Sequence, residues 1–159
     1  MLNTSLDINW AAMGKVGPVK WQGYCLSCWA FAATTQLESV DMIYHNWPYV
    51  RQSEQEMIDC TAGSCSHGGW PTYVYDRSRN HSASSDADYP YEAIDRNDDC
   101  KTTEKKVSRV DRWGDAGRSA CDMEVKLQEQ PLVVAVNADN DLWYNYSGGI
   151  IDRDSGCPD

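Results

Sequence analysis

A long apolar run begins at Cys28 and continues to about Tyr44. Its alanines and large apolar side chains favour a helix. Pro48 follows the run and marks its end, because proline cannot continue a helix. The sequence therefore predicts a central buried helix from Cys28 to about Tyr44, around which the rest of the fold has to be arranged.

The chain has 159 residues, of which 42% are hydrophobic and 24% are charged. This composition is ordinary for a globular protein, and the length suffices for one sizeable core or two small lobes that share one. Acidic residues number 24 against 14 basic ones, so the formal net charge is −10. Such a charge offers no positive field to phosphates, which argues against nucleic acid or an anionic membrane as partner. No apolar run approaches the roughly 18 residues of a membrane span.

Seven cysteines are a high number for a cytosolic chain of this length, and they indicate an oxidising compartment. Because the number is odd, at least one cysteine lies outside the chain's own disulfides. Three glycosylation sequons begin at Asn3, Asn80 and Asn145 and agree with such a compartment. The sequence therefore predicts a secreted or lysosomal glycoprotein.

Shorter elements are expected between the central helix and the middle of the chain. They are, in order, a short helix opened by a capping box at 53–56 and ending near Asp59, a glycine-rich loop at 63–71, a helix at 71–78 and a long polar loop at 79–106. The acidic stretch 95–99 lies within the polar loop. We expect it to be solvated and not to bind a metal.

The last third of the chain has a different pattern. A helix is expected at 119–130, with Val125 and Leu127 on its inner side. The β-branched run 132–136 is typical of a buried strand, and another strand is expected to begin at 148. A helical first part and a β second part predict an α+β protein of two lobes.

The stretch from Gln22 to Phe31 carries the chemistry. Cys28 lies where a loop meets the long helix, and the unpaired N–H groups at that helix end stabilise a thiolate. A thiolate is the nucleophilic form of cysteine, so Cys28 is the best nucleophile candidate. Gln22 lies six residues earlier and offers a side-chain N–H. Together with the backbone N–H of Cys28 it could hold a developing oxyanion.

The same stretch resembles the active-site signature of papain-type cysteine peptidases, Q-G-x-C-G-S-C-W-A-F, and departs from it at Leu26. Segment 151–156 is similar to the corresponding part of mite digestive peptidases, which include group 1 allergens. Further segments resemble family motifs in the family's order: 17–20, 53–60, 65–71, 89–91, 131–136 and 146–150.

This resemblance implies a papain-like α+β fold of two lobes. Residues 12–110 would form a helical left lobe, and residues 1–11 and 111–159 an incomplete β-barrel right lobe. The implied activity is that of a thiol endopeptidase that needs no cofactor and no metal. The family's general-base histidine and its asparagine follow the region around Cys157, so a missing C-terminal segment or a companion chain would have to supply them.

The resemblance also assigns the cysteines. It implies disulfides Cys25–Cys65 and Cys60–Cys100, the second of which would fasten the polar loop, and it leaves Cys28 free. Two cysteines stay unassigned, Cys121 and Cys157. Either they pair with each other, or Cys157 has a partner outside this chain.

Substrate contacts follow from the same comparison. The resemblance implies a bare backbone edge for an extended peptide at Gly68 and Gly69, and an apolar pocket for the second residue before the scissile bond, lined by Trp70, Pro71 and Ala135. We therefore expect substrates with a hydrophobic residue there, and cystatin-like proteins as inhibitors. Leu26 replaces a glycine that borders the first specificity pocket, so that pocket should be narrower. In addition, residues 9–11 read Asn-Trp-Ala where the family has Asp-Trp-Arg.

Other interpretations of these residues stay open from the sequence. His67 lies in the loop tied to Cys25 and is expected to be a loop residue near substrate, although it could substitute for the missing base. His45 and His81 are expected to be solvated. Cys25 and Cys28 could form a redox pair, or together with Cys60 and Cys65 a four-thiolate zinc site. A last alternative is a papain-fold protein that binds peptides or inhibitors without catalysis.

Overall fold

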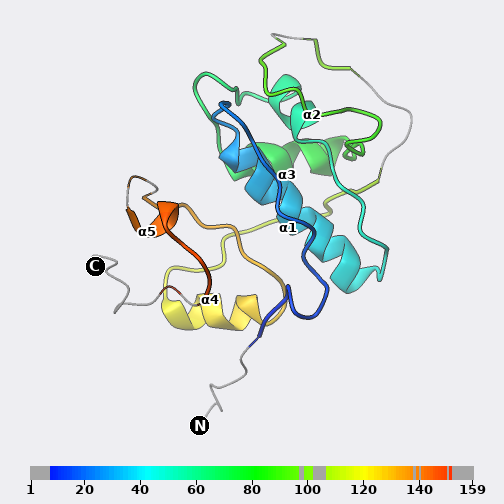
Figure 1. The fold of residues 1–159 in the computed structure, drawn as a ribbon. Coiled ribbons are helices and arrows are strands. Elements are labelled where there is room, and N and C mark those ends of the chain that lie inside the picture. The colour runs from blue at the N-terminus through cyan, green and yellow to red at the C-terminus, as the bar shows by residue number, and fades with distance from the viewer. Residues whose placement is uncertain are drawn as a thin grey trace.

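The structure is a computed structural model that describes residues 8–96, 99–101, 107–137, 139, 141–149 and 151. Within these residues it contains five helices: α1 (Cys28–Tyr44), α2 (Glu54–Asp59), α3 (Pro71–Asn80), α4 (Ala120–Leu127) and α5 (Asp141–Tyr144). Figure 1 shows α1, α2 and α3 packed together, with α4 and α5 set apart from α2 and α3. None of the helices described is long and apolar enough to cross a bilayer.

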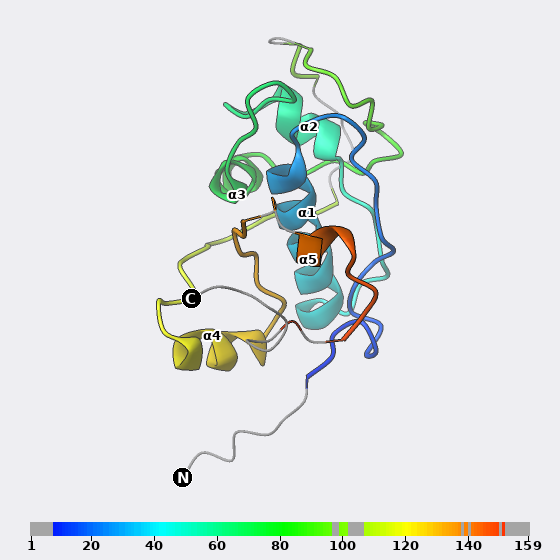
Figure 2. The same ribbon diagram turned by 60° about the vertical axis from the view of Figure 1, so that its left-hand side comes forward.

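The central helix α1 has the bounds that the apolar run predicts. Trp29, Ala30, Ala33 and Leu37 on α1 are buried and belong to one hydrophobic core. The two alanines lack bulk, so neighbouring elements can approach the α1 backbone closely. The helix packs against both α2 and α3. Figure 2 shows α1 between α2 and the part of the chain that holds α4. The core therefore surrounds the helix that begins at Cys28.

Helix α2 is buried along its whole length, and its capping box is only half formed. The Ser53 hydroxyl accepts from the N–H of Glu56 at 2.9 Å, as expected. The N–H of Ser53 donates instead to the carbonyl of Ser84 at 3.0 Å. The Glu56 carboxylate accepts from the N–H of Ser84 at 2.6 Å and pairs with Arg77 at 3.1 Å. A buried carboxylate needs such strong partners, which a cap alone does not provide.

Two disulfides and short backbone bridges hold the loops around this core. Cys25 is bonded to Cys65 and Cys60 to Cys100, the pairs that the resemblance implies, and each closes a sequence separation of 40. The polar loop is further attached through isolated antiparallel bridges, Gln52 to Ser85 and Ala83 to Ser108. The loop is thus held by covalent and backbone contacts, with few apolar side chains of its own in the core.

Helix α4 differs from the prediction in what it buries. It is shorter than expected, and Ser119 and Asp122 form a full capping box at its start. None of its residues is buried, and Val125 and Leu127 remain 49% and 39% exposed. The predicted inner side is therefore wrong for the described structure. An apolar stripe on a helix becomes an inner side only when a second element covers it.

The predicted strand at 132–136 is not formed either. Among the residues that the structure describes there are isolated bridges but no β-strand, and Val134 and Val136 are 62% and 50% exposed. A strand is stable only when it pairs with another one, and the β-branched pattern cannot supply that partner. For the second expected strand, Ile150 lies outside the described residues. The lobe boundary between 110 and 111 stays a prediction.

Candidate active site

Cys28 is the first residue of α1, exposed to solvent and outside the disulfides. The residue before it, Ser27, is the N-cap and is fully buried. The first N–H groups of a helix have no acceptor within the helix, and their combined positive field favours an anion at this end. The structure thus places an accessible thiol at the positive end of the central helix.

Gln22 lies in the loop just before this helix and is half-buried. Its side-chain N–H donates to the carbonyl of Cys25 at 2.7 Å, which folds the amide back over the loop. An amide nitrogen carries two hydrogens, so one N–H remains to donate elsewhere. Its role as an oxyanion donor stays a prediction that this fold of the loop makes feasible.

A second loop is fastened against the nucleophile loop. Besides the disulfide between Cys25 and Cys65, the N–H of Leu26 donates to the carbonyl of Cys65 at 2.9 Å. Ser64 and Gly68 exchange two backbone hydrogen bonds of 2.9 and 3.1 Å and close a tight turn. Gly68 has a φ of 75° and its Cβ position would lie 3.6 Å from the Leu26 carbonyl, so the two backbones run close together.

Trp29 sets the distance between this loop and α1. Its indole is 3% exposed and lies against two glycines. A Cβ atom added at Gly63 would approach the indole ring to 2.3 Å, and one added at Gly69 to 2.7 Å. Only glycine fits at these two positions. The residue next to the nucleophile therefore fixes the position of the expected substrate edge.

The expected pocket residues are found in different parts of the structure. Trp70 is 63% exposed and precedes α3, which begins with Pro71, and Leu26 is 54% exposed. Ala135 is exposed in the segment after α4. Gln36 on α1 donates a 2.8 Å hydrogen bond to the carbonyl of Pro131 and so attaches this segment to the core. Leu26 and Gly68 are brought together, whereas the wall expected from Ala135 stays a prediction.

Asp95 is a site residue that the sequence interpretation missed. The stretch 95–99 was expected to be solvated, but Asp95 is half-buried and accepts from the N–H groups of Cys65 and Ser66 and from the Ser66 hydroxyl. Ser66 in turn lies 2.8 Å from Nδ1 of His67. The carboxylate thus holds the turn beside the nucleophile loop. No local pattern marks it, because its partners lie about 30 residues away.

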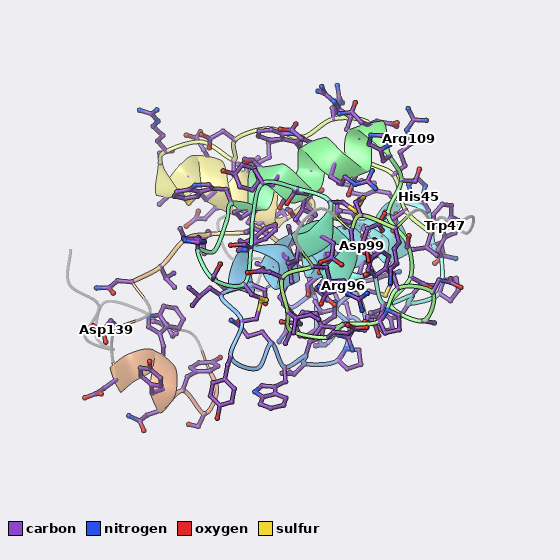
Figure 3. The ribbon with its side chains drawn as sticks, turned by 90° about the horizontal axis from the view of Figure 1, so that it is seen from above. His45, Trp47, Arg96, Asp99, Arg109 and Asp139 are labelled. Carbon is purple, nitrogen blue, oxygen red and sulfur yellow. A yellow bond between two sulfur atoms is a disulfide. The ribbon has the colours of Figure 1, made fainter. Side chains whose placement is uncertain are left out.

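The histidines are placed by the same structure. His67 is held in the turn by Ser66 and exposed, so its role beside a substrate stays a prediction. His45 follows α1 and stacks on Trp47 with ring centroids 4.7 Å apart (Figure 3). It lies at the opposite end of a 17-residue helix from Cys28, about 25 Å away by helix rise. His81 is exposed at the end of α3.

The metal and redox interpretations of the cysteines are overturned. A four-thiolate site would need Cys25, Cys60 and Cys65, whose sulfurs are all engaged in disulfides. For the same reason Cys25 is not paired with Cys28. Cys121 is a free, exposed thiol on α4, and Cys157 lies outside the described residues.

The sequons are partly placed. Asn80 ends α3 and Asn145 follows α5, and both are exposed, as a glycan acceptor must be. Asn3 lies outside the described residues. Glycosylation itself stays a prediction.

The site has a free cysteine at the start of a buried helix and a glutamine in the loop before it. The turn that contains Gly68 is bonded to that loop through Cys65. This arrangement is the one expected of a protein with a cysteine nucleophile. The sequence profile described as papain family cysteine protease matches residues 3–159. The chain therefore belongs to the papain family of cysteine proteases.

Individual relatives agree with this assignment. The chain is 33% identical over 151 residues to "Probable cysteine protease RD21B" of Arabidopsis thaliana, and the match covers 92% of this chain and 32% of that protein. It is 34% identical over 156 residues to "Papaya proteinase 4" of Carica papaya, covering 94% of this chain and 43% of that protein. The chain spans about a third of the length of the first curated relatives it matches.

Solved structures show the same fold. The bromelain protease from Ananas comosus, in complex with the E64 inhibitor, superposes with a TM-score of 0.81 at 32% identity, covering 90% of this chain and 66% of that one. A Carica candamarcensis cysteine protease in complex with E-64 gives a TM-score of 0.80 at 28% identity, covering 91% of this chain and 68% of that one. The papain-like fold is thereby confirmed. The finer similarity to mite peptidases is not confirmed by these comparisons.

Proposed function

We propose that this chain carries the nucleophile part of a thiol endopeptidase. The observation that carries the proposal is Cys28, an exposed and unbridged thiol at the first residue of the buried helix α1. Membership of the papain family supports the same reaction class. An accessible position at the positive end of a helix is the one expected of a nucleophilic sulfur.

The proposed reaction proceeds through a thioester. The Cys28 sulfur attacks the scissile carbonyl, and the carbonyl electron pair moves onto oxygen, where the Gln22 amide and the Cys28 N–H stabilise the charge. When the carbonyl re-forms, the amine leaves with a proton, and water later releases the acyl group from sulfur. We propose that a histidine from outside these 159 residues carries that proton, supplied by a longer chain or by a companion chain.

The proposed substrates are extended peptides with a hydrophobic second residue before the cut. Gly68 and Gly69 would present their backbone to the peptide, and Trp70, Pro71 and Ala135 would line the pocket. The exposed indole of Trp70 supports this assignment, because an accessible aromatic ring gains most from covering by an apolar side chain. Inhibitors of the E64 type, as bound to the bromelain relative, and cystatin-like proteins are proposed to block the same site.

The disulfides and sequons support a proposal for the location of the protein. We propose a secreted or lysosomal glycoprotein with glycans at exposed sequons. The two disulfides support an oxidising environment. The helical lobe 12–110 and the right lobe formed by 1–11 and 111–159 are proposed as its two domains.

The test compares two thiols of one molecule. Cys28 and Cys121 are both free and exposed in the structure, so Cys121 serves as an internal reference when the full-length protein is labelled. An epoxide peptide with a hydrophobic second residue is added, and mass spectrometry follows the labelling of each cysteine. We expect Cys28 to be labelled at least about 100-fold faster, and Cys28→Ser to abolish peptide hydrolysis. Equal labelling rates of the two cysteines, together with no peptide hydrolysis, would contradict the proposal and indicate a binding protein without catalysis.

A further inference from the structure

One phenol hydroxyl joins the two segments that carry the proposed oxyanion donors. Tyr91 donates its hydroxyl hydrogen to the carbonyl of Gln22 at 2.7 Å. The same oxygen lies 2.8 Å from the hydroxyl of Ser27. A phenol has one hydrogen, and the Gln22 carbonyl can only accept, so Ser27 is the donor in the second bond. Ser27 and Gln22 are separated from Tyr91 by 64 and 69 positions in the sequence, respectively.

This arrangement changes what Ser27 does at the start of α1. A serine at an N-cap ordinarily accepts from an N–H of the first helical turn. Ser27 makes no such side-chain bond, and its hydroxyl is directed to Tyr91. The side-chain oxygen of Ser27 therefore does not reduce the positive field at this helix end, where Cys28 lies.

Tyr91 itself is firmly held. Its ring meets Phe31 of α1 edge to face, with centroids 4.9 Å apart and an interplanar angle of 88°. Its N–H donates to Asp86 at 3.2 Å. Burial is the main cause that raises the pKa of Tyr91, so the hydroxyl stays protonated and remains a donor. The ring and the backbone of Tyr91 are thus held by residues outside the loop that carries Gln22.

We propose that Tyr91 is a positioning residue for the oxyanion site. Its hydroxyl holds the backbone carbonyl of Gln22, whose side chain is one proposed donor, and the side-chain hydroxyl of Ser27, which directly precedes the other donor at Cys28. The inference rests on the proposed function, because an oxyanion forms only if Cys28 attacks a carbonyl. Tyr91 acts through these two residues and does not touch the substrate.

The test separates oxyanion stabilisation from thiol reactivity in the full-length protein. A peptide aldehyde adds to Cys28: the sulfur–carbon bond forms, the carbonyl π electrons move onto oxygen, and the thiol proton ends on that oxygen. Iodoacetamide also forms a sulfur–carbon bond, but iodide leaves and no oxyanion develops. Tyr91→Phe keeps the ring on Phe31 and removes the hydroxyl. Tyr89→Phe is the matched control, because it removes another buried hydroxyl, bonded to Asp59 at 2.7 Å.

Removing an oxyanion donor costs roughly 100- to 1,000-fold in rate, so misplacing the donors should cost less, about 10-fold. For Tyr91→Phe we expect kcat and aldehyde affinity to fall about 10-fold, with KM and the iodoacetamide rate within twofold of wild type. Tyr89→Phe should lower the melting temperature but leave aldehyde affinity unchanged.

Two results would overturn the role of Tyr91: an unchanged aldehyde affinity in Tyr91→Phe, or an equal fall of aldehyde affinity and iodoacetamide rate. A wild-type protein that neither binds the aldehyde nor cleaves peptides would overturn the proposed function, and this inference with it. The wild-type control thus distinguishes the two failures.

Discussion

The ammonium group of Lys20 lies 2.6 Å from a carboxylate oxygen of Glu38, and both side chains are nearly or fully buried. Lys20 also pairs with Glu54 at 2.7 Å. It comes from the extended segment just before the nucleophile loop, whereas its partners lie on α1 and α2. The three charges therefore attach that segment to α1 and α2.

Replacing Lys20 should be strongly destabilising. Lys20→Met would keep much of the side-chain volume and leave two buried carboxylates without their shared cation. Removing one partner of a buried ion pair costs about 3–5 kcal/mol. Urea unfolding measures this loss. Lys126→Met removes an exposed pair between α4 and Glu129, which follows that helix, and should change stability by less than about 1 kcal/mol. A small effect at Lys20 would mean that water reaches these carboxylates.

Glu38 should make stability depend on pH in an unusual direction. Burial, partly offset by Lys20, raises the pKa of Glu38 above its ordinary value of 4.5. The folded state then holds a proton that the unfolded state releases, so this contribution is present below pH 4.5 and is lost as pH rises through the raised pKa. Urea unfolding of wild type and Glu38→Gln between pH 4 and 7 should show the wild type losing stability relative to the variant. Parallel curves would contradict the raised pKa.

Gly63 should not tolerate a methyl group. Its Cβ would approach the Trp29 indole to 2.3 Å, and the ring has no free space to move into because it is 3% exposed. We expect Gly63→Ala to destabilise the protein by about 1–3 kcal/mol, the usual cost of overpacking. Thermal unfolding measures it, with Gly114→Ala as control, since open space surrounds that position. Equal effects at both glycines would show that the contact with Trp29 does not matter.

Leu26 should limit which residue the enzyme accepts just before the cut. Its exposed side chain occupies the place of a family glycine beside the turn at 64–68. If the proposed function holds, Leu26→Gly should raise kcat/KM roughly 10-fold for substrates with a bulky residue there, within the range that pocket-filling groups give. Small residues at that position should show little change. An equal change for both substrate types would place Leu26 outside the pocket.

The parts of the fold that were predictable are those with local causes. The bounds of α1 follow from its own apolar run. The cap of α2 was predicted at Ser53, but Glu56 is taken by Arg77 and Ser84, whose approach no local pattern announces. The exposed sides of α4 and of segment 132–136 differ from prediction because burial depends on a covering element, which a periodic pattern does not guarantee.

The candidate site divides in the same way. Cys28 and Gln22 stand close together in the sequence, at a loop–helix junction whose chemistry can be derived from position alone. Asp95 and Tyr91 reach the site across 30 and 69 residues, respectively. They could be found only in three dimensions, through the atoms that they hold. The residues that position a site are thus harder to predict than the residue that reacts.

The disulfide between Cys25 and Cys65 makes the nucleophile loop and the glycine edge a single covalent unit. Such a bond persists in oxidising surroundings and not in the reducing cytosol. In reducing surroundings the two loops are therefore held together by non-covalent contacts such as the Leu26–Cys65 hydrogen bond. With the proposed secreted or lysosomal location, the covalent link between the nucleophile loop and the turn at 64–68 would form only after the chain has left the cytosol.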